Sequence, residues 1–222
     1  MKSAPIIITI DGPAASGKTS VSRRIAELHS WVWISTGAFY RGLAYVAKRE
    51  RIPLEDEEAL SKLCASKFWG VKISPDRTKV LLHDQDITDE IYSEENGAAA
   101  SLVSCHPKVR KNLLQAQREC AVGVDGLVAE GRDCGTVVFP NATIKFYLTA
   151  GSESRAERRA KEEGKNVEET KMAQQLRDQQ DSTRQAAPLQ IPVDAHVIDS
   201  SGHTLVEVVE LINKLITKEL EL

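Results

Sequence analysis

The chain has 222 residues, of which 41% are hydrophobic and 27% charged, and its formal net charge is −3. This length fits one ordinary domain with room for a small insertion. The slightly acidic balance gives no overall electrostatic footprint for nucleic acid. No segment reaches the roughly 18 consecutive apolar residues that a membrane-spanning helix needs.

The N-terminal segment MKSAPIIITIDGP contains one lysine and a short apolar run that ends in an aspartate. A secretory signal peptide has a longer apolar region and a cleavage site of small residues, so we interpret this segment as a buried strand. The cysteines have no C-x-x-C spacing and no histidine at a zinc-ligand spacing, so reduced and mostly buried thiols are expected. We expect a cytoplasmic protein, by default a monomer, without nucleic-acid or membrane partners. The four cysteines are Cys64, Cys105, Cys120 and Cys134.

The first part of the chain alternates strands and helices. Ile6–Ile10 is an apolar, β-branched run, which predicts a strand buried on both faces of a parallel sheet. A helix is predicted from Gly17 to about Leu28. A second strand at Trp31–Ser35 is followed by a helix from Thr36 to about Arg51, and then by a helix over Glu55–Ser66.

An antiparallel hairpin interrupts this alternation. The segments Phe68–Ser74 and Thr78–Asp84 have strand-like composition, and a turn is predicted at Ser74–Arg77 between them. We therefore expect a small inserted subdomain over about residues 66–92.

The second half returns to helices and buried strands, and it contains no internal repeat. Strand–helix alternation of this kind predicts an α/β fold with a doubly wound parallel sheet flanked by helices. The stretch 152–185 is helical and highly charged, with a break at Gly164. The other predicted elements are helices at Ser93–Cys105 and Pro107–Cys120, where Pro107 marks a helix start, strands at Gly126–Glu130, Thr143–Ala150 and Ala195–Ser201, and a closing amphipathic helix from Leu205 to about Glu219.

A phosphate-binding loop follows the first strand, because residues 12–19 match G-x-x-x-x-G-K-[ST] completely. Gly12 and Gly17 allow the tight turn that points successive N–H groups into one concavity, and the helix N-terminus adds positive charge. Lys18 should reach the β- and γ-phosphates, and the Thr19 hydroxyl should ligate Mg²⁺. The predicted ATP-binding residues are Gly12, Pro13, Ala14, Ala15, Ser16, Gly17, Lys18, Thr19 and Ser20.

The loop alone does not identify the acceptor of the phosphoryl group. The N-K-x-D sequence that reads guanine in GTPases is missing, and helicases and motors are longer chains. A small-molecule kinase is therefore the leading class. Alternatives are a kinase acting on UMP, AMP, a sugar or a shikimate-like alcohol, and a nucleotide-dependent binding module with a hydrolytic P-loop.

Four arginine-bearing segments lie at or near predicted strand ends or helix termini, where ligands gather in open α/β sheets. A single arginine is most often an exposed surface charge. A set of them beside a P-loop predicts a phosphate-bearing acceptor, because guanidinium binds phosphate in two places. The segments are Ser35–Arg41, His106–Arg110, Glu130–Thr136 and Arg177–Arg184.

The pair Arg132-Asp133 follows the predicted strand that ends at Glu130. If that strand neighbours the first one, the pair lies at the carboxyl edge of the sheet beside the phosphate loop. Glu130 or Asp133 would then organise Mg²⁺ through water or accept a hydrogen bond from the acceptor. The alternative is an ordinary surface ion pair.

A predicted lid occupies about residues 152–166, where Arg155, Arg158 and Arg159 alternate with acidic residues. Alternating charges by themselves indicate an exposed helix with i,i+4 pairs. Phosphoryl transfer, however, depends on positioning and charge neutralisation, and a mobile segment with arginines supplies both while it excludes water.

The order of the motifs resembles that of the bacterial cytidylate kinase family, nucleoside monophosphate kinases that transfer a phosphoryl group from ATP to CMP or dCMP. The resemblance covers essentially the whole chain. It implies one P-loop kinase domain over residues 1–222, with a mobile lid and a monophosphate-binding region that includes the antiparallel insert. It is carried by IDGPAASGKTS, STGAFYR, ITDEI, SCHPKVR, EGRDCGTVVFP, RAERR, RDQQDSTR and APLQIPVDAHVIDSS.

The resemblance also implies roles for residues of the acceptor site. Thr36, Arg41 and Arg132 would hold the CMP phosphate and its neighbouring groups. Arg177 and Asp181 would meet the ribose hydroxyls.

Three further residues, Ser101, Arg110 and Asp133, would read the cytosine edge, where an acceptor for the exocyclic amine separates cytosine from uracil. Arg184 would approach the phosphates from the same helix as the ribose-binding residues.

The lid arginines Arg158 and Arg159, with Arg155 as a further candidate, would surround the phosphoryl group during transfer. Together with these implied roles, the phosphate-loop lysine completes the predicted catalytic set, which is Lys18, Arg132, Arg158, Arg159 and Arg184.

Three positions depart from the family pattern. Ser35 stands where several relatives have aspartate, Glu130 stands where many have aspartate, and Gln180 stands where many have arginine. These departures concern the rate and the grip on phosphate rather than the reaction class.

Overall fold

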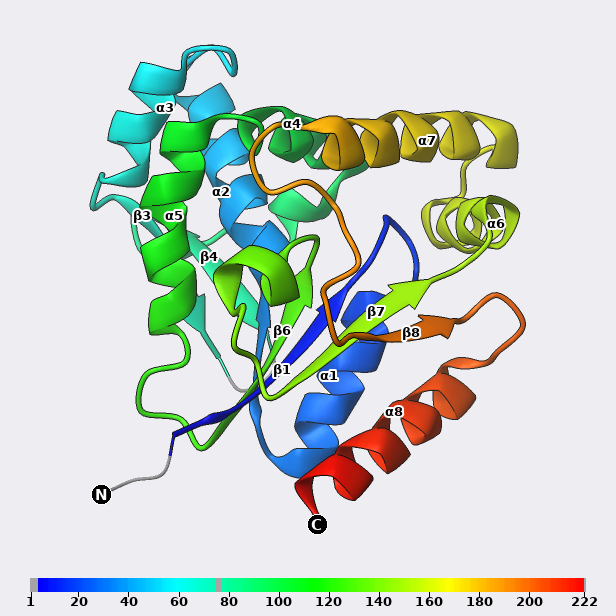
Figure 1. Ribbon diagram of the computed structural model, residues 1–222. Coiled ribbons are helices and arrows are strands. Elements are labelled where there is room, and N and C mark those ends of the chain that lie inside the picture. Colours follow the sequence, from blue (N-terminus) through cyan, green and yellow to red (C-terminus); the bar gives the residue numbers. More distant parts are fainter. Residues whose placement is uncertain (1–3, 75–76, 222) are drawn as a thin grey trace.

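Five parallel strands form the central sheet in the order β2-β6-β1-β7-β8. The computed structural model describes residues 4–74 and 77–221 (Figure 1). The predicted doubly wound α/β fold is confirmed, and the strand that precedes Arg132 does neighbour the first strand. The strands are β1 (Ile6–Asp11), β2 (Val32–Ser35), β6 (Gly126–Gly131), β7 (Ile144–Thr149) and β8 (His196–Asp199).

Helices cover both faces of this sheet. On one face α1 (Lys18–His29) and α8 (Leu205–Leu220) pack with β1, β6, β7 and β8 in one hydrophobic cluster. On the other face lie α5 (Pro107–Glu119) and the short π-helical segment η2 (Cys134–Val138). Because both faces are covered, the apolar β-branched composition of the central strands is explained by burial.

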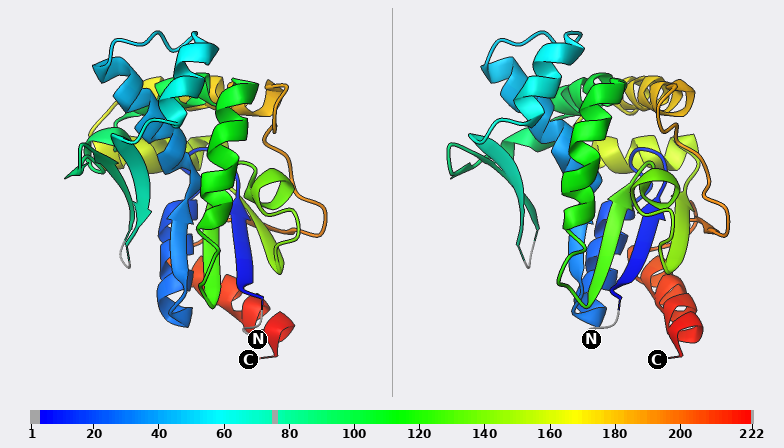
Figure 2. Two further views of the ribbon diagram at one scale, coloured as in Figure 1. Left: turned by 90° about the vertical axis from the view of Figure 1, so that its left-hand side faces the viewer. Right: turned by 60° about the vertical axis from the view of Figure 1, so that its left-hand side comes forward.

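A second hydrophobic core lies beside the sheet. It joins helices α2 to α5 with a small antiparallel sheet of order β3-β4-β5, which lies next to α2 and away from α8 (Figure 2). The predicted hairpin is therefore present, with Val71 opposite Val80. The added elements are α2 (Thr36–Arg49), α3 (Glu57–Cys64), β3 (Trp69–Ile73), β4 (Thr78–Leu82), β5 (Gln85–Asp86), the 3₁₀ turn η1 (Glu90–Tyr92) and α4 (Glu94–Val103).

The remaining predicted elements agree with the structure within a few residues at their ends. The charged stretch divides at Gly164, which has a left-handed φ of 65°, into α6 (Ser152–Glu163) and α7 (Val167–Thr183). Sequence analysis missed β5, η1 and η2, which are all short. The predicted turn at Ser74–Arg77 falls partly on Pro75 and Asp76, which lie outside the described residues.

The carboxyl ends of the five strands meet at one edge, and every segment that follows them starts there. β1 leads into the phosphate loop, β2 into α2, β6 into Arg132-Asp133, β7 into α6, and β8 into Ser200. Helices α4 and α7 lie across this edge (Figure 1). This arrangement gathers the predicted site residues from distant parts of the chain.

None of the described helices combines the length and apolar character that a membrane crossing requires. All four cysteines are free; Cys134 is buried, and Cys64, Cys105 and Cys120 are partly buried.

Candidate active site

The phosphate loop has the backbone geometry that its sequence predicts. A Cβ on Gly12 would lie 2.0 Å from the carbonyl oxygen of Leu148, so only glycine fits this close approach to β7. Gly17 has a φ of 88° just before α1, and Ala15 has a φ of 56°. These left-handed residues fold the loop into a concavity at the N-terminus of α1, where backbone N–H groups bind anions.

Lys18 is buried within this loop. Its Nζ donates to the carbonyl of Pro13 at 2.6 Å and to Ser16 Oγ at 3.4 Å. Burial, together with the positive charge of Arg132, lowers the pKa of Lys18 from 10.5 to about 7, although the carboxylate of Glu130 opposes the shift. An anionic ligand in the loop would therefore favour the protonated lysine.

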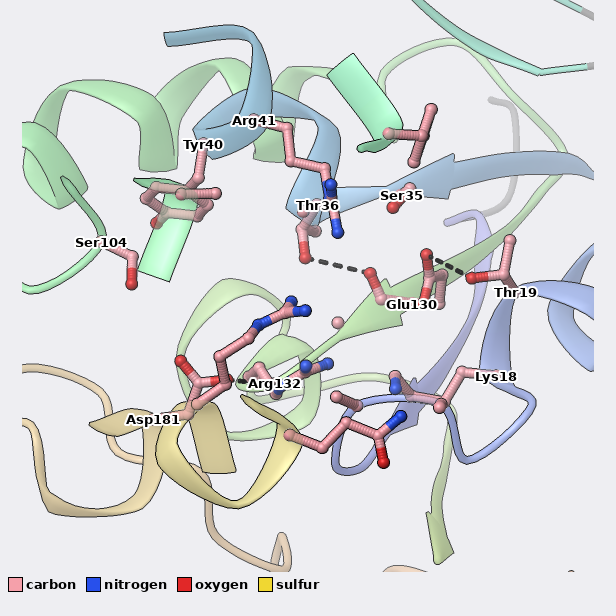
Figure 3. A pocket seen from close by; sticks show the side chains of 18 of the residues that line it. Lys18, Thr19, Ser35, Thr36, Tyr40, Arg41, Ser104, Glu130, Arg132 and Asp181 are labelled. Carbon is pink, nitrogen blue, oxygen red and sulfur yellow. Dashed lines mark hydrogen bonds and ion pairs between the residues drawn. The ribbon is translucent and has the colours of Figure 1, made fainter. Parts of the chain in front are cut away.

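A cavity of about 380 Å³ opens beside the loop. Figure 3 shows Lys18 and Thr19 on one side, Tyr40, Ser104 and Asp181 on the other, and further polar side chains between them. Its lining carries more basic than acidic groups, which suits a ligand with several phosphates. Among the described residues, the basic lining groups are Lys18, Arg41, Arg132, Arg158, Arg159, Arg177 and Arg184, and the acidic ones are Glu94, Glu130, Asp133 and Asp181.

The donor set next to Lys18 fits Mg²⁺. Thr19 Oγ1 donates to Glu130 Oε1 at 3.3 Å, and both residues line the cavity (Figure 3). Within the described residues no group of three or more His, Cys, Asp or Glu side chains could hold a metal by itself. A hydroxyl and one carboxylate are a suitable protein contribution for Mg²⁺, which takes its other oxygen ligands from phosphates and water.

Five charged side chains of alternating sign form a buried network at the far end of the cavity. Arg110 pairs with Asp133, whose other oxygen lies 3.5 Å from Arg184 Nη2. Arg184 Nη1 lies 3.7 Å from Asp181 Oδ1, and Asp181 Oδ2 accepts from Arg132 Nε at 2.8 Å. The two carboxylates offset most of the charge of the three guanidinium groups, and the net positive charge that remains suits an anionic ligand.

The segment that carries Arg132 and Asp133 is anchored by Asp11 at the end of β1. The buried Asp11 carboxylate accepts from the backbone N–H of Cys134 at 2.8 Å and of Gly135 at 2.7 Å. Burial raises the pKa of Asp11 from 3.8 to about 6, and these two hydrogen bonds oppose the shift. Asp11 thus fixes the start of η2, directly after the two predicted site residues.

Arg41 reaches the cavity from α2. Its Nη1 donates to the carbonyls of Ile91 and Ser93, both at 3.0 Å, and the guanidinium lies over the Tyr92 ring. Burial lowers the pKa of Arg41 to about 10, and the charge of Arg177 adds to this effect. Two guanidinium groups that influence each other in this way are suited to a shared anionic ligand.

Two of the predicted lid arginines line the cavity from α6 and have different partners. Arg158 donates to the Ser200 carbonyl at 2.6 Å and to its Oγ at 3.1 Å, beyond the end of β8. Arg159 Nη2 lies 3.2 Å from Glu94 Oε2, and Arg177 Nη1 of α7 lies 2.7 Å from Glu94 Oε1. The α4 carboxylate therefore joins α6 to α7.

Most of the predicted site residues come together around the cavity, but not all of them line it. Arg110 lies behind Asp133, and Ser101 accepts through its carbonyl from Ser104 Oγ at 2.8 Å. Thr36 lines the cavity and donates to the Glu130 carbonyl at 3.0 Å. Sequence analysis assigned no role to Tyr40, Tyr92, Glu94, Ser104 and Gln174, which also line it.

Comparisons with known proteins show the family to which the chain belongs. The chain is 55% identical over 207 residues to a cytidylate kinase of Bdellovibrio bacteriovorus, covering 93% of this chain and 95% of that one. It is 42% identical over 220 residues to a cytidylate kinase of Geobacillus kaustophilus, covering 97% and 98%. The crystal structure of TT1252 from Thermus thermophilus matches with a TM-score of 0.51 at 19% identity, over 98% of this chain and 99% of that one, which supports the fold alone. The cytidylate kinase family model matches residues 8–218, and the chain belongs to the cytidylate kinase family.

Proposed function

We propose that this chain transfers the terminal phosphoryl group of ATP to CMP and dCMP, giving ADP and CDP or dCDP, in pyrimidine nucleotide metabolism. One observation carries the proposal: the phosphate loop and the buried network around Asp133 open into the same cavity. One end is suited to a triphosphate and the other to a polar acceptor that carries its own phosphate.

The donor end would bind ATP through residues 12–20. Backbone N–H groups of the loop would hold the phosphates, and Lys18 would exchange its contact with the Pro13 carbonyl for the β- and γ-phosphates. Thr19 and Glu130 would hold Mg²⁺ directly or through water. When bound, Mg²⁺ supplies positive charge that neutralises the phosphate oxygens.

At the acceptor end, Thr36, Arg41 and Arg132 would orient the CMP phosphate, which supplies the attacking oxygen. Arg177 and Asp181 would meet the ribose hydroxyls from adjacent turns of α7. Because a nucleoside monophosphate already carries a reactive anionic oxygen, no deprotonating base is required. Catalysis would rest on alignment and on charge stabilisation.

Recognition of cytosine would depend on Asp133, held by Arg110 and Arg184. Its carboxylate is a hydrogen-bond acceptor for the exocyclic amine of cytosine, which uracil lacks. Ser101 lies one helical turn before Ser104, which faces the cavity, so the two serines share this end of α4.

Two subregions of the kinase domain are assigned to the acceptor and to the lid. Residues 66–92 would belong to the monophosphate-binding region, and residues 152–166 to a lid that delivers Arg158, Arg159 and their neighbours. Arg184 would complete the catalytic charges from the end of α7. We further propose a monomeric, cytoplasmic enzyme without nucleic-acid or membrane partners.

The decisive experiment measures steady-state ADP release with Mg-ATP and separate acceptors: CMP, dCMP, UMP, AMP, GMP and shikimate. Turnover with CMP and dCMP well above all others is expected. Equal turnover with UMP would contradict cytosine recognition and leave a P-loop kinase of broader specificity. ATP hydrolysis that ignores every acceptor would contradict the kinase proposal.

A further inference from the structure

The backbone of Ala14 in the phosphate loop is held by two side chains from outside the loop. Its N–H donates to Asp178 Oδ1 of α7 at 3.1 Å, and its carbonyl accepts from Arg155 Nη1 of α6 at 3.0 Å. Arg155 and Asp178 also pair with each other at 2.5 Å. The phosphate loop, α6 and α7 are thus joined at the backbone of one residue.

Arg155 makes further hydrogen bonds at this junction. Its Nε donates to the Ala150 carbonyl at the end of β7 at 3.1 Å, and Gln174 of α7 donates to its backbone carbonyl at 3.3 Å. The residue is 7% exposed, and unlike Arg158 and Arg159 it does not line the cavity. It is therefore placed to hold the phosphate loop in position rather than to reach a phosphate.

Asp178 lies on the helix that presents the acceptor-binding side chains. Arg177 and Asp181, one residue before it and three residues after it, both line the cavity. A shift of α7 relative to Ala14 would move both of them relative to the donor phosphates. Small errors of alignment lower the rate of phosphoryl transfer by large factors. This contact therefore helps to set the alignment between donor and acceptor.

From these contacts we propose that Arg155 and Asp178 are positioning residues that fix α7, and the acceptor groups it carries, to the phosphate loop. The inference rests on the proposed kinase activity. Neither residue is among those that line the cavity. They act through the backbone of Ala14, so their loss should reduce turnover more than the binding of either nucleotide.

The first test compares Asp178→Asn, Arg155→Met and the double variant with the parent protein. Each single variant is expected to lower kcat at least tenfold while both KM values stay within threefold. The double variant should lose no more than the worse single variant, because both changes break one junction. Glu157→Gln on α6 and Gln179→Ala on α7, both exposed, serve as controls with unchanged kinetics.

Two outcomes would overturn the proposal. One is an unchanged kcat in both single variants. The other is a rise in KM with unchanged kcat, which would make these residues substrate-binding groups. If Arg155→Met does not fold, Arg155→Lys replaces it. Lysine keeps the charge but cannot reproduce the hydrogen bonds of the guanidinium to Ala14, Ala150 and Asp178. A parental kcat in both Arg155→Lys and Asp178→Asn would also overturn the proposal.

A measurement independent of turnover separates this inference from the proposed function. Hydrogen–deuterium exchange is followed over residues 167–183 with and without ATP. In the parent, ATP should protect α7 as well as the phosphate loop, and in Asp178→Asn the protection of α7 should be lost while that of the loop remains. Equal protection of α7 in both proteins would refute the inference, whereas a parent without CMP-dependent turnover would refute only the kinase proposal.

Discussion

The carboxylate of Glu94 on α4 lies 2.7 Å from the guanidinium of Arg177 on α7. Its other oxygen pairs with Arg159 on α6. The Glu94 pKa is lowered: burial raises it, but the charges and hydrogen bonds of Arg177 and Arg159 outweigh burial. Glu94 thus supplies an internal counter-ion for arginines that we assign to substrate phosphate and ribose.

The first prediction concerns this carboxylate. Glu94→Gln removes a carboxylate that competes with the ligands for Arg177 and Arg159, so the ribose hydroxyls that we assign to Arg177 should bind it more readily. We expect the KM for CMP to fall about two- to fivefold, in the range of modest charge effects, and the melting temperature without ligand to drop.

Steady-state kinetics and thermal melting check this prediction, with Glu95→Gln as the matched control. Glu95 is the next residue, is largely exposed and pairs with Lys48 on the surface, so its change should leave both quantities unaltered. A raised KM for CMP in Glu94→Gln, with unchanged melting, would show that Glu94 assists binding instead of competing with it.

The second prediction concerns Lys18, whose pKa burial lowers to about 7. At pH 8 the lysine of the free protein is mostly neutral, and a bound triphosphate restores its charge. ATP binding should therefore take up close to one proton at pH 8 and much less at pH 6, where the lysine is already protonated.

Calorimetric titration in two buffers of different ionisation enthalpy measures this uptake. Lys18→Ala should show none of it and should abolish turnover while the protein stays folded. Uptake that persists in Lys18→Ala would assign the proton to another group, and surviving turnover would exclude the proposed mechanism.

The third prediction concerns base recognition by Asp133. Asp133→Asn keeps the size of the side chain but adds a donor where the cytosine amine needs an acceptor. The ratio of kcat/KM for CMP to that for UMP should fall at least tenfold, consistent with the cost of unpaired polar groups in a specific site. An unchanged ratio would remove Asp133 from the recognition of the base.

Asn is the better choice than Ala at this position. Ala would leave Arg110 and Arg184 buried with no acceptor at this position, at a cost of about 3–5 kcal/mol, whereas Asn loses the charge but keeps an amide oxygen that accepts hydrogen bonds. A loss of stability in Asp133→Ala would then obscure the change in specificity, so thermal melting accompanies both variants.

The fourth prediction concerns Asp11, whose pKa burial raises from 3.8 to about 6. The folded protein binds this proton more tightly than the unfolded chain, so the contribution of Asp11 to stability is largest below pH 4. It is lost as the pH rises through 6, by about 3 kcal/mol in all.

Urea unfolding at pH 4 to 7 tests this slope. In Asp11→Asn the group no longer titrates, so the free energy of unfolding of the parent should decline relative to that of the variant across this range. Parallel curves for the two proteins would contradict the raised pKa.

Much of the site could be predicted because its determinants are local. The glycines and Lys18 of the phosphate loop follow one buried strand, and Arg177 and Asp181 are four residues apart on one helix, which places them on one face. The predicted placement of Arg132 beside the phosphate loop required β6 to neighbour β1. The structure confirms that these two strands pair.

Other parts could not be predicted because they depend on packing between distant segments. Glu94 looks like any acidic residue in the first turn of a helix, and its role exists only because α4 meets α6 and α7. Alternating charges around Arg155 gave no sign that this arginine is buried against Ala14. The anchoring of η2 by Asp11 likewise joins residues more than a hundred positions apart.

The second hydrophobic core affects how the molecule can evolve by amino-acid substitution. Helices α2 to α5 and the antiparallel sheet pack around their own apolar residues, largely apart from those that join β1 to α1 and α8. Substitutions that reshape the acceptor end can therefore be absorbed there without repacking the layer beneath the phosphate loop. One half of such a molecule is free to diverge toward new acceptors while the other keeps a constant donor.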